Sequence, residues 1–348
     1  MLKKKFTTLK LATYLLMKTA LKAAFSLILT GVFLWITFHD IDWQSLIQTF
    51  QNTAPAGIIG GAALTIISCL PRAWRWRILL TSVSKKIRIS SAFKAVLIAY
   101  AGNNIFPRAG EFARVVALTR MHPMPVGSVV ASVIVERLLD MLTLLIFFAV
   151  VLVYTRDKIA HAFPGLESIG ILTLIGLLVA FTMLIVLSIY GDHGIKKLEQ
   201  LTSRISPTAA PKVSKLLHAF LQGMAGVKSL EGYVGIFVST LLTNLCYVLS
   251  IYLPFYSFGF IEQYNLTLFD ALVVMVLASV GVVIPTPGGT GTYHFFCSKT
   301  LYLFYGIPEI QALAFATVVH GAAFVSFFIF GGPALFRLLW TQKKEAQI

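Results

Sequence analysis

Long apolar runs recur along this chain at the length that a helix needs to cross a lipid bilayer. About 20 helical residues span the hydrocarbon core of a membrane. Soluble domains are about half apolar and a quarter charged, whereas this chain is 57% hydrophobic and 12% charged. We therefore predict an all-α, polytopic membrane helical bundle. The expected spans lie near 21–38, 55–80, 126–154, 166–190, 233–260 and 309–338.

Basic residues gather between these runs and set the expected topology. The 348 residues include 29 Lys and Arg against 14 Asp and Glu, a net charge of +15. Lys and Arg concentrate in cytoplasmic loops near anionic headgroups. Both termini are then cytoplasmic, in a multi-pass protein of the cell (inner) membrane. We expect no nucleic-acid partner, because no segment is large enough for a soluble binding module. The basic segments expected on the cytoplasmic side are 3–22, 72–94, 196–228 and 337–344.

The second span is expected to end at the cytoplasmic face in the sequence PRAWRWRILL. In this interpretation Arg72 and Arg75 belong to the cytoplasmic charge cluster. Trp74 and Trp76 are residues of the kind found in the aromatic belt at the membrane interface.

Two apolar segments, 91–120 and 268–305, are broken by polar residues. The loop charges agree with one topology only if each segment leaves on the side that it entered. This predicts two re-entrant helical hairpins, the first from the cytoplasm and the second from outside, beside about six full crossings. Broken segments that enter from opposite faces indicate the inverted repeats of transporters. The alternative is that one or both segments are kinked crossings.

We expect a single integral membrane domain over residues 1–348. Its first half, 20–154, contains the first hairpin. Residues 155–232 hold the fourth span and a basic cytoplasmic loop. The second half, 233–340, contains the second hairpin.

The first hairpin carries the polar sequence NNIFPRAGEFARVV. Pro107 removes a backbone donor and Gly110 permits a turn. Asn103 and Asn104 can cap the backbone groups that such a break frees. Broken backbone at membrane depth survives only where protein or a watery cavity satisfies it.

Three charged residues follow this break at helical spacing. A helix starting near Arg108 places Arg108, Glu111 and Arg114 on one face. One interpretation is a salt-bridged turn at the interface. The other is an anion site, with two guanidinium groups for phosphate oxygens and a carboxylate that orients or releases them.

The third span carries charges about ten to fifteen residues from its start, in VIVERLLDML. Each costs about 2.5–3.5 kcal/mol at the bilayer centre on insertion scales. Glu136 and Asp140 lie one turn apart and repel unless a cation lies between them. Arg137 and the arginines of the first hairpin are the candidates. The charges indicate a translocation path or a structural ion network.

The second hairpin is interrupted by IPTPGGTGTYHFF. Pro285 and Pro287 end one half-helix, and a new half-helix is expected to start near Thr290. Its N-terminus would lie inside the membrane, where free backbone N–H groups suit an anionic group. Close packing through small residues is the alternative. The residues concerned are Gly288, Gly289 and Gly291, with His294 one turn later.

Together, RAWRWRILL, NNIFPRAGEFARVVAL, ASVIVERLLDMLTLL and PTPGGTGTYHFF resemble the transmembrane region of the lysylphosphatidylglycerol synthetase/flippase family, over residues 20 to 340. The resemblance implies a flippase-like domain with two re-entrant elements. The family's third motif usually ends in a glutamate where this chain has His294, which bears on the charge of the substrate. The motifs map onto Asn104, Pro107, Arg108, Gly110, Glu111, Arg114, Glu136, Arg137, Asp140, Pro287, Gly288, Gly289 and Gly291.

We therefore predict a flippase that moves a phospholipid or related amphiphile between leaflets. We expect no synthetase activity, because no segment corresponds to the family's soluble aminoacyl-transferring domain. We also expect no cofactor or metal, since no nucleotide loop and no metal-ligand spacing occur. A membrane-embedded lipid transferase or hydrolase, and a non-transporting scaffold, are the alternatives. Self-association is left open.

Overall fold

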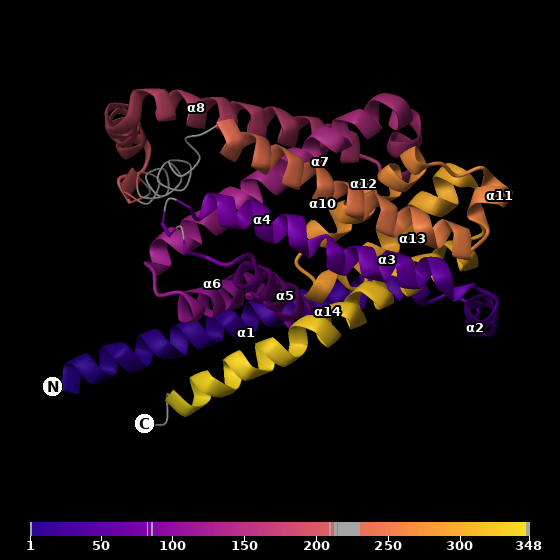
Figure 1. Cartoon of the computed structure of the whole chain (residues 1–348), viewed down its shortest axis with the longest axis horizontal. Coiled ribbons are helices and arrows are strands. Elements are labelled where there is room, and N and C mark those ends of the chain that lie inside the picture. Colours follow the sequence, from indigo (N-terminus) through magenta and orange to yellow (C-terminus); the bar gives the residue numbers. More distant parts are fainter. Residues whose placement is uncertain are drawn as a thin grey trace.

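The chain forms a bundle of helices in a computed structural model, shown in Figure 1. The structure describes residues 2–81, 83–84, 86–208, 210–211, 214 and 230–345, and no strand occurs in them. Both termini lie at one end of the bundle, and α2 and α11 lie at the opposite end (Figure 1). Most of the predicted basic loop, including residues 215–229, lies outside the described part.

The helices follow one another with short connections. They are α1 (Leu2–Phe38), α2 (Trp43–Gln51), α3 (Pro55–Ile67), α4 (Cys69–Leu79), α5 (Ile89–Ile105), α6 (Ala109–Met121), α7 (Val126–Ala162), α8 (Leu166–Ile205), α10 (Leu230–Ser257), α11 (Phe260–Tyr264), α12 (Leu268–Val283), the 3₁₀ turn η1 (Pro287–Gly289), α13 (Thr292–Tyr305) and α14 (Glu309–Glu345).

Five segments of the described chain are long and apolar enough to cross a membrane. They match five of the predicted spans and confirm a polytopic bundle. Helix α8 covers the predicted fourth span, and its segment Leu166–Gly176 is apolar. The second span consists of α3 and α4, which meet at Ser68, whose hydroxyl donates to the Thr65 carbonyl at 2.6 Å. The five segments are Ala20–Phe38, Pro55–Leu79, Val126–Ala162, Leu230–Ser257 and Glu309–Trp340.

The segment 91–120 forms a helical hairpin of α5 and α6. At 1.5 Å per residue, their 17 and 13 residues reach only about 26 and 20 Å, less than the ~30 Å core. Glycine brings the two helices into backbone contact, because a Cβ at Gly110 would lie 1.7 Å from the Ala99 carbonyl oxygen. The hairpin that the sequence predicts is therefore present, and its re-entry into a membrane stays a prediction.

A second helical hairpin joins α12 and α13 through η1. Helix α12 begins with a capping box, in which the Thr267 and Asp270 side chains bond each other's backbone N–H groups. Gly281 packs against the backbone of α13, since a Cβ there would lie 2.6 Å from the Thr292 carbonyl oxygen. The turn requires glycine at Gly288, where φ is +59°.

The two hairpins meet at their tips, and each packs against a long helix of the other half of the chain. A Cβ at Gly288 would lie 2.8 Å from Oδ1 of Asn104. Helix α5 packs on α14, and α12 packs on α7. This reciprocal packing is compatible with the predicted inverted repeat, which stays a prediction.

Candidate functional site

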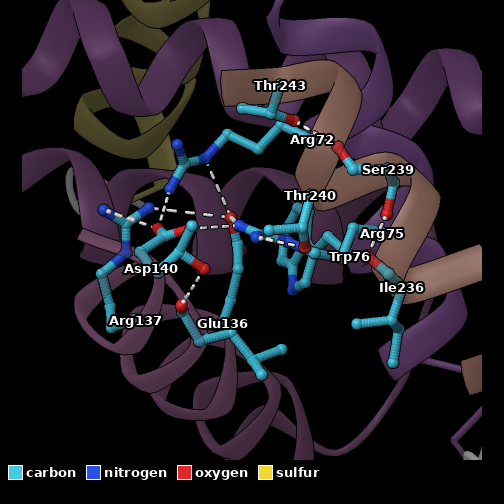
Figure 2. Close-up of polar contacts among 12 residues, drawn as sticks. Arg72, Arg75, Trp76, Glu136, Arg137, Asp140, Ile236, Ser239, Thr240 and Thr243 are labelled. Carbon is cyan, nitrogen blue, oxygen red and sulfur yellow. Dashed lines mark hydrogen bonds and ion pairs between the residues drawn. The ribbon is translucent and has the colours of Figure 1, made fainter. Parts of the chain in front are cut away.

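Seven charged side chains from three helices meet in the interior of the bundle. Helix α4 supplies two arginines, α6 supplies a glutamate and an arginine, and α7 supplies three residues. Figure 2 shows the part contributed by α4 and α7. We call the set the ion cluster. Its members are Arg72, Arg75, Glu111, Arg114, Glu136, Arg137 and Asp140.

Glu136 lies at the centre of the ion cluster, and its side chain is fully buried. Its Oε2 accepts from Nη1 of Arg114 at 2.6 Å. Its Oε1 lies 2.9 Å from Nε of Arg72, with Arg75 at 3.5 Å and Arg137 at 3.7 Å. A buried carboxylate is costly unless it is paired and hydrogen-bonded, and here four guanidinium groups surround one carboxylate.

Asp140 lies one turn after Glu136 and completes the pairing. Arg72 and Arg75 both donate to its carboxylate, and Nη1 of Arg137 lies 3.6 Å away. Arg72 therefore bridges the two carboxylates, with Nε on Glu136 and Nη2 on Asp140. The sequence predicted that a cation must lie between these acids, and Arg114 was among the candidates.

The placement of Arg72 and Arg75 in a cytoplasmic charge cluster was wrong. They are 4% and 0% exposed, inside the bundle. Sequence reasoning missed them as site residues because the positive-inside rule accounts equally well for any arginine near a span end. A signal was present, since they lie three residues apart on one helical face while Arg77 is exposed.

Trp76 does not lie in the interfacial belt. Its side chain is fully buried, and its indole N–H donates to the Ser132 hydroxyl at 2.9 Å. The guanidinium of Arg114 lies 4.9 Å from the ring centroid. The indole is therefore a wall of the ion cluster that supplies a cation–π contact.

Two tyrosines and a threonine extend the ion cluster to α5 and α10. Nη1 of Arg72 donates to the hydroxyls of Tyr100 and Tyr247, each at 2.9 Å, and these hydroxyls are 2.8 Å apart. Arg75 donates to the Thr240 hydroxyl at 3.1 Å, as Figure 2 shows. Five helices are thus held around one set of charges.

The charged residues of the first hairpin only partly follow the prediction. Glu111 and Arg114 form an ion pair at 2.8 Å. Arg108 begins α6 with a left-handed backbone, φ +63°, and its side chain is exposed. Among the described residues it forms none of the ion pairs of the cluster. The structure therefore does not place Arg108 beside Arg114 as the second arm of a phosphate clamp.

The two asparagines of the first hairpin serve its broken backbone. Oδ1 of Asn103 accepts from the Gly110 N–H at 2.9 Å, which caps the start of α6 after the break at Pro107. Nδ2 of Asn104 donates to the Phe324 carbonyl in α14 at 3.2 Å. Asn103 therefore satisfies a group that the break leaves free, and Asn104 fixes the hairpin tip to α14.

The glycine-rich turn does not offer the free N–H groups that the sequence predicts. Helix α13 begins at Thr292, and the turn between Pro285 and this residue satisfies its own donors. A carbonyl or ring nitrogen already occupies each donor, so this helix end is closed to an anion. The N–H groups of Gly289, Thr290 and Gly291 donate to the Thr286 carbonyl at 3.2 Å, the Pro287 carbonyl at 3.0 Å and Nδ1 of His294 at 3.2 Å.

Two histidines hold this turn against the bundle. His294 is 6% exposed and its ring centroid lies 4.8 Å from that of His320. Nε2 of His320 bonds the Gly288 carbonyl at 2.9 Å. The Ser26 hydroxyl donates to the Pro285 carbonyl at 2.7 Å, which connects α1 to the same turn. His294 thus has a structural partner, Gly291, in the position where the resemblance implies an acid.

One line of contacts links the ion cluster to the glycine-rich turn. Tyr100 in the cluster and Asn104 at the hairpin tip lie one turn apart on α5. Asn104 contacts Gly288 across the two tips, and Gly288 contacts His320. The predicted site residues, other than Arg108, are therefore brought together by packing and not by an open crevice.

The ion cluster is closed on one side and accessible on the other. The side chains of Arg75, Arg114 and Glu136 are at most 1% exposed, whereas that of Arg137 is 41% exposed. Within the part of the chain that the structure describes, no three His, Cys, Asp or Glu side chains could hold a metal ion. The site is an ionic one whose open side is Arg137.

An all-helical bundle of membrane-length helices, with two short hairpins beside buried charges, defines a multi-pass integral membrane protein. Residues 21–331 match the lysylphosphatidylglycerol synthase TM region, and the chain belongs to that family.

Two curated proteins are similar to parts of the chain. The UPF0104 membrane protein MJ1595 of Methanocaldococcus jannaschii is 26% identical over 284 residues, 78% of this chain and 82% of that protein. Glycosyltransferase AglD of Haloferax volcanii is 30% identical over 128 residues, which cover 36% of this chain and 20% of that protein.

Proposed function

We propose that this protein is a flippase that moves a phospholipid or related anionic amphiphile between membrane leaflets. The observation that carries the proposal is the charge of the ion cluster. Four guanidinium groups face three carboxylates, so one positive charge lacks a partner within the cluster. Charges held inside a membrane bundle are costly and mark substrate paths, and an excess cation suits one phosphate.

Arg137 is the residue that receives the phosphate in this proposal. It is the most exposed cation of the cluster, and its contacts to Glu111, Glu136 and Asp140 are long, at 3.5, 3.7 and 3.6 Å. A planar guanidinium can bind two oxygens of a phosphate at once. Weak internal pairing leaves this group free to exchange a carboxylate for a lipid phosphate.

Glu111 is suited to release the lipid again. It bonds Arg114 at 2.8 Å and lies 3.5 Å from Arg137. A carboxylate that competes with the phosphate for Arg137 limits the depth of the bound state and so keeps the headgroup mobile. The headgroup would pass beside the cluster and the hairpin tips while the acyl chains stay in lipid.

The family and the hairpins support a transport role over catalysis. Short helices that break at membrane depth line substrate sites in transporters. We propose that both hairpins are re-entrant, that the termini are cytoplasmic, and that the protein resides in the cell (inner) membrane and is not an enzyme. The drive would be a lipid or proton gradient or the membrane potential, which supplies about 2.3 kcal/mol per charge per 100 mV.

A reconstitution assay tests the proposal. The full chain is placed in liposomes with fluorescent phosphatidylglycerol, and dithionite reports the lipid that reaches the outer leaflet. We expect wild-type protein to exchange the lipid, and Glu111→Gln to do so about tenfold more slowly, a change of about 1.4 kcal/mol in barrier. Glu167→Gln is the matched control, because its ion pair with Arg156 lies outside the cluster. No exchange by the wild type, or equal rates for wild type and Glu111→Gln, would contradict the proposal.

A further inference from the structure

A separate cavity of about 420 Å³ lies at the end of the bundle that carries α2 and α11. We call it the α2–α11 cavity. Its volume is within the range of roughly 300–1,000 Å³ that is usual for small-molecule sites. The ion cluster does not contribute to it, since its lining comes from α2, the end of α10, α11 and the start of α14. The lining residues are Thr49, Asn52, Thr53, Tyr256, Ser257, Phe258, Gly259, Gln263 and Gln311.

The lining carries no formal charge and is rich in hydrogen-bonding groups. Asn52, Gln263 and Gln311 each present an amide with two donors and an acceptor oxygen. Among the described residues, no side-chain hydrogen bond occupies these amides. The Thr49 and Thr53 hydroxyls donate to backbone carbonyls at 2.8 and 2.7 Å, which leaves their oxygens able to accept.

Ser257 supplies an independent indication that this cavity receives a ligand. The residue is 8% exposed, and its hydroxyl has no hydrogen-bond partner. A buried hydroxyl without a partner costs about 1–3 kcal/mol, so such groups have an external partner as a rule. The Ser257 carbonyl accepts from the Ala54 N–H at 3.2 Å, which fixes this wall of the cavity against the start of α3.

We propose that the α2–α11 cavity binds an uncharged polyhydroxylated group, a sugar or a polyol, either free or as the headgroup of a lipid. Side-chain amides and hydroxyls match alternating donors and acceptors on a ring of hydroxyl groups. The exposed ring of Tyr256 offers an apolar face for the C–H side of such a group. The absence of charge among the nine lining residues disfavours a phosphate, which the ion cluster suits instead.

Binding to the full chain in nanodiscs tests this proposal. Methyl glucoside in solution is the free probe, and monoglucosyl diacylglycerol is the lipid probe, followed by native mass spectrometry. Phosphatidylglycerol is the anionic comparison. We expect at least one glucosyl probe to bind, and Gln263→Leu and Ser257→Ala to weaken it about tenfold and several-fold. Binding of methyl glucoside would identify a free sugar as sufficient, and binding of the glycolipid alone would identify a lipid headgroup.

The control is Gln48→Leu, an exposed amide on α2 that does not line the cavity. It should bind like the wild type, and melting temperatures check that all variants fold. No binding of either glucosyl probe, or equal binding by wild type and a folded Gln263→Leu or Ser257→Ala variant, would overturn the proposal. The proposal does not rest on phospholipid transport, because the readout is binding and a protein that moves no phospholipid can still bind the sugar.

Discussion

Arg72 and Glu136 form the buried link between the second and third spans, with Nε of the arginine 2.9 Å from Oε1 of the glutamate. The same guanidinium also bonds Asp140, Tyr100 and Tyr247. One side chain therefore connects α4, α5, α7 and α10, so the ion cluster stabilises the fold as well as forming the candidate site.

Replacing Glu136 by glutamine should destabilise the protein strongly. The change leaves four guanidinium groups around two carboxylates in a buried site. Breaking a buried ion pair costs about 3–5 kcal/mol. Denaturant unfolding in detergent measures the loss. Glu167→Gln should cost about 0–1 kcal/mol, because its partner Arg156 is largely exposed. Equal losses for the two variants would show that the cluster does not stabilise the fold.

Replacing Gly110 by alanine should separate the two helices of the first hairpin. The new Cβ would lie 1.7 Å from the Ala99 carbonyl oxygen, so α6 must move away from α5. Overpacking of this kind costs about 1–3 kcal/mol or more. A lowered melting temperature reports the change. Gly127→Ala is the control, because nothing lies within 4 Å of its Cβ position and its helix should tolerate alanine. A hairpin that accepts both substitutions alike would contradict the packing described here.

Replacing His320 by leucine should weaken the glycine-rich turn. The Gly288 carbonyl loses its bond to Nε2, and leaving a buried acceptor unpaired costs about 1–3 kcal/mol. Hydrogen exchange of the turn residues, followed by mass spectrometry, should become faster around Gly288. His161→Leu, an exposed histidine on α7, should leave this exchange unchanged. Unchanged exchange in His320→Leu would mean that the imidazole does not hold the turn.

The sequence predicted the parts of the fold that depend on apolar length and on helix breakers. Spans such as 126–154 and the breaks at Pro107 and Pro287 are local features, so they are legible in one stretch of chain. The pairing of Glu111 with Arg114 was also predictable, because residues three apart on a helix are neighbours.

The partners of Glu136 from α4 were not predictable in the same way. Arg72 and Arg75 reach it through tertiary packing, which no spacing in the sequence records. Arg108 failed for a local reason, since its left-handed backbone places it before the helix whose face it was expected to share. The free N–H groups expected near Gly289 are satisfied by turn geometry that composition does not reveal.

The rate of phosphatidylglycerol exchange by Arg137→Gln tests the central claim most directly, with Arg77→Gln as control. Both changes remove one positive charge, but Arg77 is exposed on another face of α4. We predict that Arg137→Gln lowers the exchange rate about tenfold or more while Arg77→Gln retains the wild-type rate. Equal rates for the two folded variants would contradict a phosphate-binding role for the ion cluster.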